Sequence, residues 1–276
     1  MCIRDRYTPS EGAVTFGGTD LTALKGEKQL NPFRRQIQMI FQDPFSSLNP
    51  RMTIEDSVAF GPLVHGTARN EAIAVARGLL GRVGLDPQRF AGRYPHELSG
   101  GQRQRVNIAR ALALHPRLVI LDEAVSALDK SVEAQVLNLL LDLKDDFGLT
   151  YMFISHDLNV VRYISDRVMV MYLGEVVELG PVEQVFDAPR HPYTQALLRS
   201  MPSMEPGQRT ESAPLSGDPP NPIDPPSGCR FHTRCAQARA VCARQAPDMT
   251  RQGDGHAVRC LIYQPDSGYA DSGALA

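Results

Sequence analysis

Two carboxylates directly follow a short apolar stretch in the middle of this sequence. Residues 118–121 read LVIL, and Asp122 and Glu123 come next. An all-apolar run of this length is typical of a buried parallel strand, and ligands of open α/β sheets bind at the carboxyl ends of the strands. We therefore expect Asp122 to bind Mg²⁺ and Glu123 to polarise an attacking water. The competing interpretation is a strand that ends in solvated acids.

A second pattern has the features of a phosphate-binding helix start. Residues 98–105 read LSGGQRQR and run into helical text. Gly100 and Gly101 leave backbone N–H groups uncovered, and these donors together with the positive end of the helix dipole suit a phosphate. Ser99 adds a hydroxyl donor, and Gln102 completes the motif. Taken alone, the pattern is more typical of a Gly-Gly turn before an amphipathic helix.

Two further polar residues follow expected strands. Gln42 comes after the strand expected over Arg35–Phe41, and its amide could reach a metal-bound water. His156 comes after the strand expected over Leu149–Ser155, where an imidazole could contact a γ-phosphate or hold the water and Glu123 in register. A lone histidine is more often a structural hydrogen-bonding residue.

The elements that must position these residues alternate between strand and helix. We expect a strand at Val14–Phe16, a helix over Glu71–Val83 that ends at Gly84, and a helix along Val132–Leu143 that is capped by Ser131. This alternation favours an α/β fold with a doubly wound parallel sheet.

Composition divides the chain near residue 200. Residues 201–228 hold eight of the 21 prolines, which predicts an extended linker. We expect a domain over 1–200, this linker over 201–228, a small extension over 229–262 and a tail over 263–276. The balance of 29 Lys and Arg against 31 Asp and Glu excludes a strongly basic nucleic-acid binder. Because no apolar run approaches the ~20 residues of a membrane span and the first residues do not resemble a signal peptide, the expected compartment is the cytosol.

Four of the five cysteines lie in the extension: Cys229, Cys235, Cys242 and Cys260. Disulfides are rare in the cytosol, so four thiolates together indicate a metal or cluster site. Their spacings are wider than the Cys-x2-Cys pairs of structural zinc, and four cysteines also suit an iron–sulfur cluster. His256 is a further candidate ligand.

Taken in order, these motifs resemble the ATP-binding subunit of an ABC transporter, from about Thr8 to Pro202. The resemblance implies an ABC-type P-loop ATPase domain with a helical signature subdomain, ATP and Mg²⁺ as ligands, and head-to-tail dimers. The roles that it implies are the Q-loop for Gln42, the signature sequence for LSGGQ, the Walker B strand for LVILDE, the D-loop at the dimer seam for Asp129, and the switch histidine for His156.

Longer stretches resemble one branch of that family, the dipeptide and oligopeptide importers. They include FQDPFSSLNPRMT at residues 41–53 and HPYTQALL at residues 191–198. This resemblance implies a heterodimer with a second, unlike ATPase subunit, which binds two permease subunits at the cytoplasmic face of the membrane and works with an extracytoplasmic solute-binding protein. Residues 43–60 would form much of the groove for a permease helix, and the four cysteines would hold a [4Fe–4S] cluster, with Zn²⁺ as the alternative.

One family motif is missing. The family requires G-x-x-x-x-G-K-[ST], and the lysines of this sequence (Lys25, Lys28, Lys130 and Lys144) never follow a glycine. We expect the chain to be a fragment, truncated or mis-joined at its start, that binds MgATP weakly and has no meaningful turnover alone.

Three alternatives to a peptide importer ATPase stay open to different degrees. An ABC ATPase of DNA repair or of ribosomes would need long insertions or tandem halves, which 276 residues do not hold. A non-catalytic module that docks to a permease or holds a cluster is the second. The third is an importer ATPase for nickel or another small solute.

Overall fold

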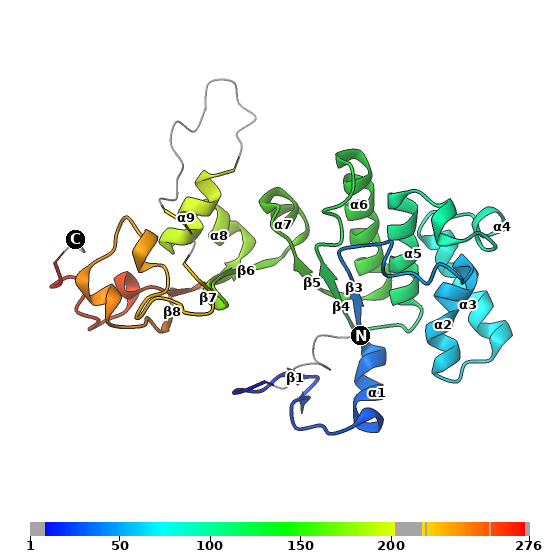
Figure 1. Ribbon diagram of the computed structural model, residues 1–276, viewed down its shortest axis with the longest axis horizontal. Coiled ribbons are helices and arrows are strands. Elements are labelled where there is room, and N and C mark those ends of the chain that lie inside the picture. Colours follow the sequence, from blue (N-terminus) through cyan, green and yellow to red (C-terminus); the bar gives the residue numbers. More distant parts are fainter. Residues whose placement is uncertain (1–8, 202–216, 219, 254, 274–276) are drawn as a thin grey trace. The chain divides into compact units, whose positions relative to one another are not determined.

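The computed structural model describes residues 9–201, 217–218, 220–253 and 255–273, and the chain packs into two compact units, Met1–Asp157 and Leu158–Ala276 (Figure 1). The sequence suggested a division near residue 200 instead. The contacts divide the chain earlier because strands on both sides of the proline-rich segment pair in one sheet of the second unit. Most of that segment, residues 202–216 and 219, lies outside the described residues.

The first unit is built on a parallel sheet of three strands in the order β3-β4-β5. The strands are β3 (Ile37–Ile40), β4 (Leu118–Asp122) and β5 (Thr150–Ile154), and β4 lies between the other two. This confirms the expected parallel arrangement. The first strand begins later than the sequence suggested, because Arg35 and Gln36 end the helix α1 (Glu27–Gln36). A small hairpin of β1 (Thr15–Phe16) and β2 (Thr19–Asp20) precedes it.

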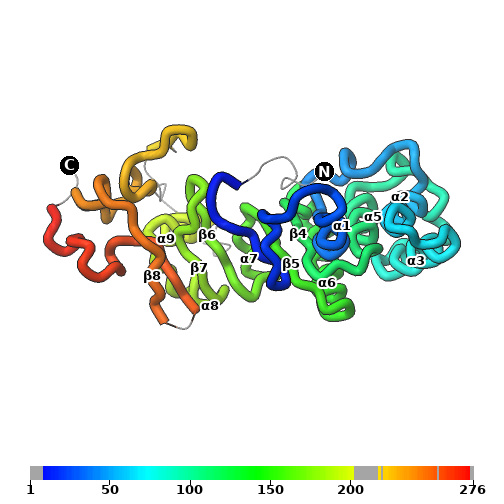
Figure 2. Tube along the Cα trace, turned by 90° about the horizontal axis from the view of Figure 1, so that it is seen from below, coloured from blue at the N-terminus to red at the C-terminus, as the bar shows by residue number. Residues whose placement is uncertain are grey.

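A group of helices packs beside this sheet (Figures 1 and 2). It consists of α2 (Ile54–Val64), α3 (Arg69–Arg82), α4 (Pro87–Phe90), the 3-10 turn η2 (Pro95–Glu97) and α5 (Gly100–Leu112). The helix expected over Glu71–Val83 is confirmed as α3. Its apolar face is buried as the 3.6-residue period predicts: Ala72, Ala76, Leu79, Leu80 and Val83.

The helix α6 (Lys130–Phe147) connects β4 to β5, and its first turn corrects one expectation. Asp129, and not Ser131, is the N-cap, since its carboxylate accepts the backbone N–H of Val132 at 2.9 Å. Ser131 already lies in the first turn, where its hydroxyl donates to the same carboxylate oxygen of Asp129 at 2.7 Å. The helix ends at Gly148, whose φ of 61° is the left-handed conformation that favours glycine.

The second unit contains an antiparallel sheet in the order β6-β7-β9-β8. Its strands are β6 (Arg167–Tyr172), β7 (Glu175–Pro181), β8 (Met249–Arg251) and β9 (Ala257–Arg259). The helices of this unit are α7 (Leu158–Ile164), α8 (Val182–Asp187) and α9 (Pro192–Arg199), and short 3-10 turns follow: η3 (His232–Arg234), η4 (Ala240–Ala243) and η5 (Leu261–Tyr263).

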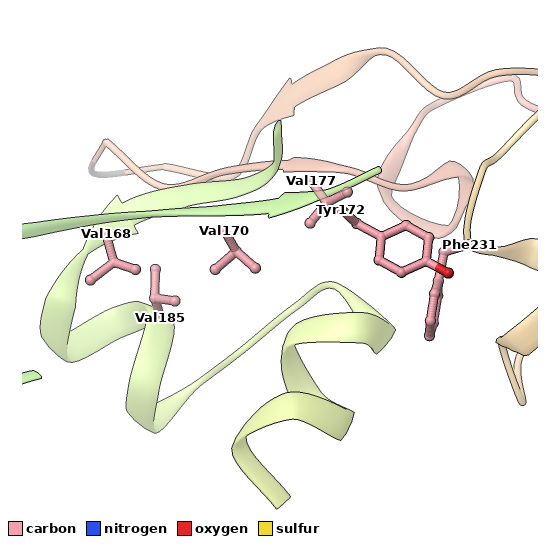
Figure 3. Packing of buried hydrophobic residues seen from close by; sticks show 6 residues of the cluster. All are labelled: Val168, Val170, Tyr172, Val177, Val185 and Phe231. Atoms are coloured by element: carbon pink, nitrogen blue, oxygen red, sulfur yellow. The ribbon is translucent and has the colours of Figure 1, made fainter. Parts of the chain in front are cut away.

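Alternate residues of β6 form the core of the second unit (Figure 3). Val168, Val170 and Tyr172 are buried on one face of the strand, where Val185 of α8 packs against them. Phe231, which is 2% exposed, packs edge-on against Tyr172 at a centroid distance of 5.2 Å. The cysteine-bearing extension therefore completes this core. Among the described residues, the helices are too short or too polar to cross a lipid bilayer.

Candidate active site

Glu123 occupies an unusual backbone conformation directly after β4. Its φ is 47°, in the left-handed region that residues with side chains rarely adopt. Its N–H donates to the carbonyl of Ile154 at 2.9 Å, and its carbonyl accepts from the backbone N–H and the hydroxyl of Ser126 at 3.1 and 2.9 Å. Such a conformation costs about 1–3 kcal/mol and persists where the surroundings fix it, most often at functional sites.

The structure brings the three expected catalytic residues together. Gln42 donates through Nε2 to Oε2 of Glu123 at 2.6 Å, and Nδ1 of His156 lies 3.2 Å from Oε1 of the same carboxylate. Because a carboxylate only accepts hydrogen bonds, Nδ1 of His156 carries the proton in this contact. These residues follow β3, β4 and β5, whose carboxyl ends lie at one edge of the sheet. Because His156 is 73% exposed, its contact with Glu123 stabilises the fold very little. The contact instead fixes the position of the Glu123 carboxylate.

The donor set at this edge fits a magnesium ion. Asp122 is the last residue of β4 and is half-buried. Within the part of the chain that the structure describes, its carboxylate makes no hydrogen bond or ion pair. The side-chain nitrogen of Gln42 donates to Glu123, so the side-chain carbonyl oxygen of Gln42 remains available as a second hard ligand. Protein sites for Mg²⁺ commonly supply one or two such oxygens and leave the rest to water and phosphate.

The glycine motif starts the helix α5 in the expected way. Ser99 is the N-cap, and it exchanges bonds with Gln102: the N–H of Gln102 donates to the Ser99 hydroxyl at 3.3 Å, and the N–H of Ser99 donates to Oε1 of Gln102 at 3.0 Å. The Ser99 hydroxyl accepts in this pair and keeps its own proton for another acceptor. Gly101 has a packing role as well, because a Cβ at this position would overlap Cγ1 of Val132.

The glycine motif and the Glu123 carboxylate do not contact each other through polar groups in the described residues. Among the described residues, no hydrogen bond or ion pair joins Ser99–Gln102 to Glu123 or His156. Asp129 is likewise occupied locally as the cap of α6. Its pKa lies below the usual value because the backbone N–H of Val132 and the hydroxyl of Ser131 donate to its carboxylate.

Sequence reasoning missed an ion pair next to the site. The ammonium of Lys130, at the start of α6, contacts Asp157 and Glu133, both at 2.9 Å, and these bonds raise its pKa. Asp157 directly follows His156, so Lys130 ties the first turn of α6 to the segment that carries the histidine. The available signal was adjacency, since Lys130 and Asp157 each follow a motif residue by one position.

The four cysteines of the extension line one cavity of about 20 Å³, together with His191 and Phe231. All four are free thiols. Burial raises the pKa of Cys229 to about 11 and that of Cys260 to about 12. In the described residues, no three His, Cys, Asp or Glu side chains are arranged to hold one metal ion, so this finding supports neither the expected iron–sulfur cluster nor zinc.

His256 is not a ligand of the cysteine site. Its Nε2 lies 2.7 Å from Oε1 of Glu178, and both side chains are almost completely buried, at 2% and 0% exposed. The same carboxylate accepts the backbone N–H groups of Arg190 and His191 at 2.7 and 3.0 Å. His256 therefore joins β9 to β7 and to the start of α9, which explains its place in the sequence.

Comparisons with known proteins match both units. A family model described as "ABC transporter" matches residues 1–126, and one described as "Oligopeptide/dipeptide transporter, C-terminal region" matches residues 177–242. The oligopeptide transport ATP-binding protein AppF of Bacillus subtilis is 51% identical over 263 residues, which are 93% of this chain and 79% of that protein. The probable peptide ABC transporter ATP-binding protein y4tS of Sinorhizobium fredii is 48% identical over 93% of this chain and 72% of its own.

Solved structures share the fold at lower identity. CbiO1 of Clostridium perfringens, described as part of the ABC transporter complex cbiONQ, aligns with a TM-score of 0.60 and 28% identity over 66% of this chain and 70% of its own. The ATP-binding cassette MJ0796, solved as a dimer in a post-hydrolysis state with ADP and Pi, aligns with a TM-score of 0.56 and 32% identity over 64% and 76%.

Proposed function

The chain belongs to the ATP-binding proteins of oligopeptide and dipeptide ABC transporters, and from this premise we propose how its residues work in peptide import. It is an ABC-type ATPase subunit that couples ATP hydrolysis to import. The observation that carries the residue assignment is the contact of Gln42, Glu123 and His156 at the ends of three parallel strands.

In the proposed site, Glu123 polarises the water that attacks the γ-phosphate, and His156 holds that carboxylate in register. Asp122 and the carbonyl oxygen of Gln42 would hold Mg²⁺, which would neutralise charge on the phosphates. Ser99, Gly100, Gly101 and Gln102 bind the phosphates of a nucleotide on a second subunit through the start of α5. Asp129 lies at the seam between the two subunits.

We place the chain on the cytoplasmic face of the membrane, with transmembrane permease subunits as its partners. The finer composition that we propose is a heterodimer with an unlike ATPase subunit, two permeases and an extracytoplasmic solute-binding protein. The names of the relatives support peptides as the solute. Hydrolysis by the reconstituted transporter tests this choice: peptide-loaded binding protein should stimulate it, whereas stimulation by nickel alone would establish the small-solute alternative.

The missing lysine limits what these 276 residues do alone. They contain no Gly-Lys pair, so the β- and γ-phosphates lack their usual lysine and cradle of N–H donors. We propose that the chain alone binds MgATP weakly and that it lends its LSGGQ motif to a complete partner subunit. Isothermal titration should detect no tight binding by the isolated chain, and a micromolar affinity would contradict the proposal.

For the cysteine cavity we propose an iron–sulfur cluster. Four thiols line one cavity, and each iron of a four-iron cluster takes a single thiolate, so no three thiols need converge on one ion. Anaerobic purification should give a coloured protein with bound iron. A colourless protein with stoichiometric zinc would establish the alternative metal, and a metal-free protein would contradict both.

A further inference from the structure

The last described stretch of the chain returns to the cysteine cavity. It leaves η5 and passes through a turn in which Asp266 and Gly268 have left-handed φ angles of 57° and 68°. Ser267 lies between them and is buried, and its hydroxyl donates to the carbonyl of Leu261 at 2.8 Å. This turn therefore fixes the base of the segment that follows, residues 268–273, which we call the tail segment.

A single arginine holds the tail segment. Nη1 of Arg239 donates to the backbone carbonyls of Tyr269 and Ala270 at 2.8 and 2.7 Å, and the carbonyl of Ser272 lies 3.3 Å from the same nitrogen. The guanidinium also lies over the ring of Tyr269, 4.6 Å from its centroid. Hydrogen bonds from a charged donor are stronger than neutral ones, so Arg239 acts as a latch on the tail segment.

The latch belongs to the loop that carries two of the cysteines. Arg239 lies between Cys235 and Cys242 in the sequence, and its backbone carbonyl accepts the N–H of Cys242 at 2.8 Å. Tyr269, which the latch holds, is one of the residues that line the cavity of the four cysteines. Its hydroxyl donates to the carbonyl of Gln237, on the same loop, at 2.7 Å. The tail segment is therefore fixed to this loop, with its aromatic ring at the cavity.

The cavity that Tyr269 lines is nearly closed. Its volume of about 20 Å³ is room for about one water molecule, and Cys242 and Cys260 are each 8% exposed. Reagents larger than water therefore reach these thiols only when the structure opens. The tail segment can open at low cost, because most of its residues are exposed: Gly268, Ala270, Asp271 and Gly273. Its release leaves the buried cluster around Phe231 in place, because other parts of the unit form that cluster.

We propose that the tail segment is a lid over the cysteine cavity and that Arg239 is its latch, so that the contacts of Arg239 limit the access of small solutes to the thiols. Oxidants, chelators and alkylating reagents are the solutes concerned. The lid opens at the turn before Tyr269 and closes when Arg239 binds the carbonyls again. The proposal goes beyond the proposed function, because the lid restricts access whether the cavity holds free thiols or a cluster.

The test is the rate at which iodoacetamide alkylates each cysteine of the native full chain, measured by mass spectrometry of its peptides, which separates the cavity cysteines from Cys2. Arg239→Met removes the latch. It should speed the alkylation of Cys242 and Cys260 by about tenfold or more, because losing charged hydrogen bonds raises the population of the open form. Tyr269→Ala removes the ring at the cavity and should have a similar effect, whereas Tyr269→Phe keeps the ring and should have a smaller one.

The matched control is Arg190→Met. Arg190 is also a half-buried arginine of this unit, with its guanidinium over the ring of Tyr263 at 5.8 Å and a hydrogen bond to Oε1 of Gln252 at 3.0 Å. Neither partner belongs to the lid, so this variant should keep the wild-type alkylation rates. Should Arg239→Met fail to fold, Tyr269→Ala carries the test. Urea below the unfolding transition identifies local opening, because alkylation through the lid does not depend on it, whereas alkylation through global unfolding does.

Three results would overturn the lid: wild-type alkylation rates in the folded Arg239→Met and Tyr269→Ala proteins, an equal acceleration in Arg190→Met, or an acceleration that depends on urea as global unfolding does. If the chain is purified with a bound cluster, the rate at which a chelator bleaches its colour is compared in the same variants. The same order of rates is expected, and equal bleaching rates would overturn the lid. A colourless, metal-free protein contradicts the proposed cluster and leaves the alkylation comparison unaffected, so the two failures are distinguishable.

Discussion

At the scale of single residues, Glu123 combines a strained backbone with a carboxylate that two side chains engage. The sequence predicted Gln42, Glu123 and His156 as candidates because each follows a predicted strand, and parallel strands place such residues at one edge. It did not predict the left-handed φ of Glu123. That conformation depends on the carbonyl of Ile154 and the hydroxyl of Ser126, and no local pattern at Glu123 reports those bonds.

Gly101 gives a prediction at this scale. A methyl group at Gly101 would overlap Val132, whereas one at Gly100 would meet Leu128 at an ordinary 3.8 Å. Gly101→Ala should therefore lower the free energy of unfolding by about 1–3 kcal/mol, as overpacking does. Urea unfolding measures the change.

Gly100→Ala is the control and should change stability much less than Gly101→Ala. Adding Val132→Ala to Gly101→Ala should restore most of the loss, because it removes the overlapping methyl group. Equal losses in the two single glycine variants would show that overlap with Val132 is not the cause.

At the scale of elements, the first turn of α6 shows a feature that the sequence pattern did not predict correctly, the identity of the N-cap. Ser131 and Asp129 are both good N-cap types, so composition did not distinguish them. The backbone conformation identifies the N-cap as Asp129, which has the extended conformation of a cap, with φ −66° and ψ 154°.

Asp129→Ala should therefore lower the melting temperature more than Ser131→Ala does, since the cap and its bond to the Val132 N–H are lost. Because the pKa of Asp129 is lowered in the folded protein, its contribution to stability also depends on pH. That contribution is present above the unfolded pKa of 3.8 and is lost as pH falls through the lower folded pKa. Thermal melts at pH 7 and at pH 3 measure both effects, and a larger loss in Ser131→Ala would contradict the assignment.

The N-cap of α9 predicts a second pH dependence. Nδ1 of His191 accepts the N–H of Tyr193 at 3.0 Å, and burial lowers the pKa of His191 from 6.5 to about 4. Between these values the unfolded chain binds a proton that the folded chain excludes. Stability is therefore complete above pH 6.5 and falls by up to about 1.4 kcal/mol per unit as pH drops toward 4.

His191→Asn keeps a good N-cap without a titrating ring and should lose this share of the pH dependence. Urea unfolding at pH 7 and pH 5 compares the two proteins. The same loss of stability in both would show that His191 does not titrate as described.

At the scale of the whole molecule, the alternation of strand and helix was sufficient to predict the parallel sheet, and the motif order was sufficient to predict the family. The sheet β6-β7-β9-β8 was not predicted, because β9 is three residues long and pairs with Glu178 and Leu179, which lie far earlier in the chain. The cluster around Phe231 likewise joins residues that lie far apart in the chain. Short strands that rely on distant partners carry little local signal.

The central claim is that Glu123 is the residue that activates water in an ABC ATPase site. The most direct measurement is ATP hydrolysis by the assembled transporter, using this chain extended upstream by a strand and a G-x-x-x-x-G-K-[ST] loop. The account predicts that Glu123→Gln lowers the rate by about 100-fold or more while bound ATP is retained. Hydrolysis at the unsubstituted rate by the Glu123→Gln transporter would contradict it.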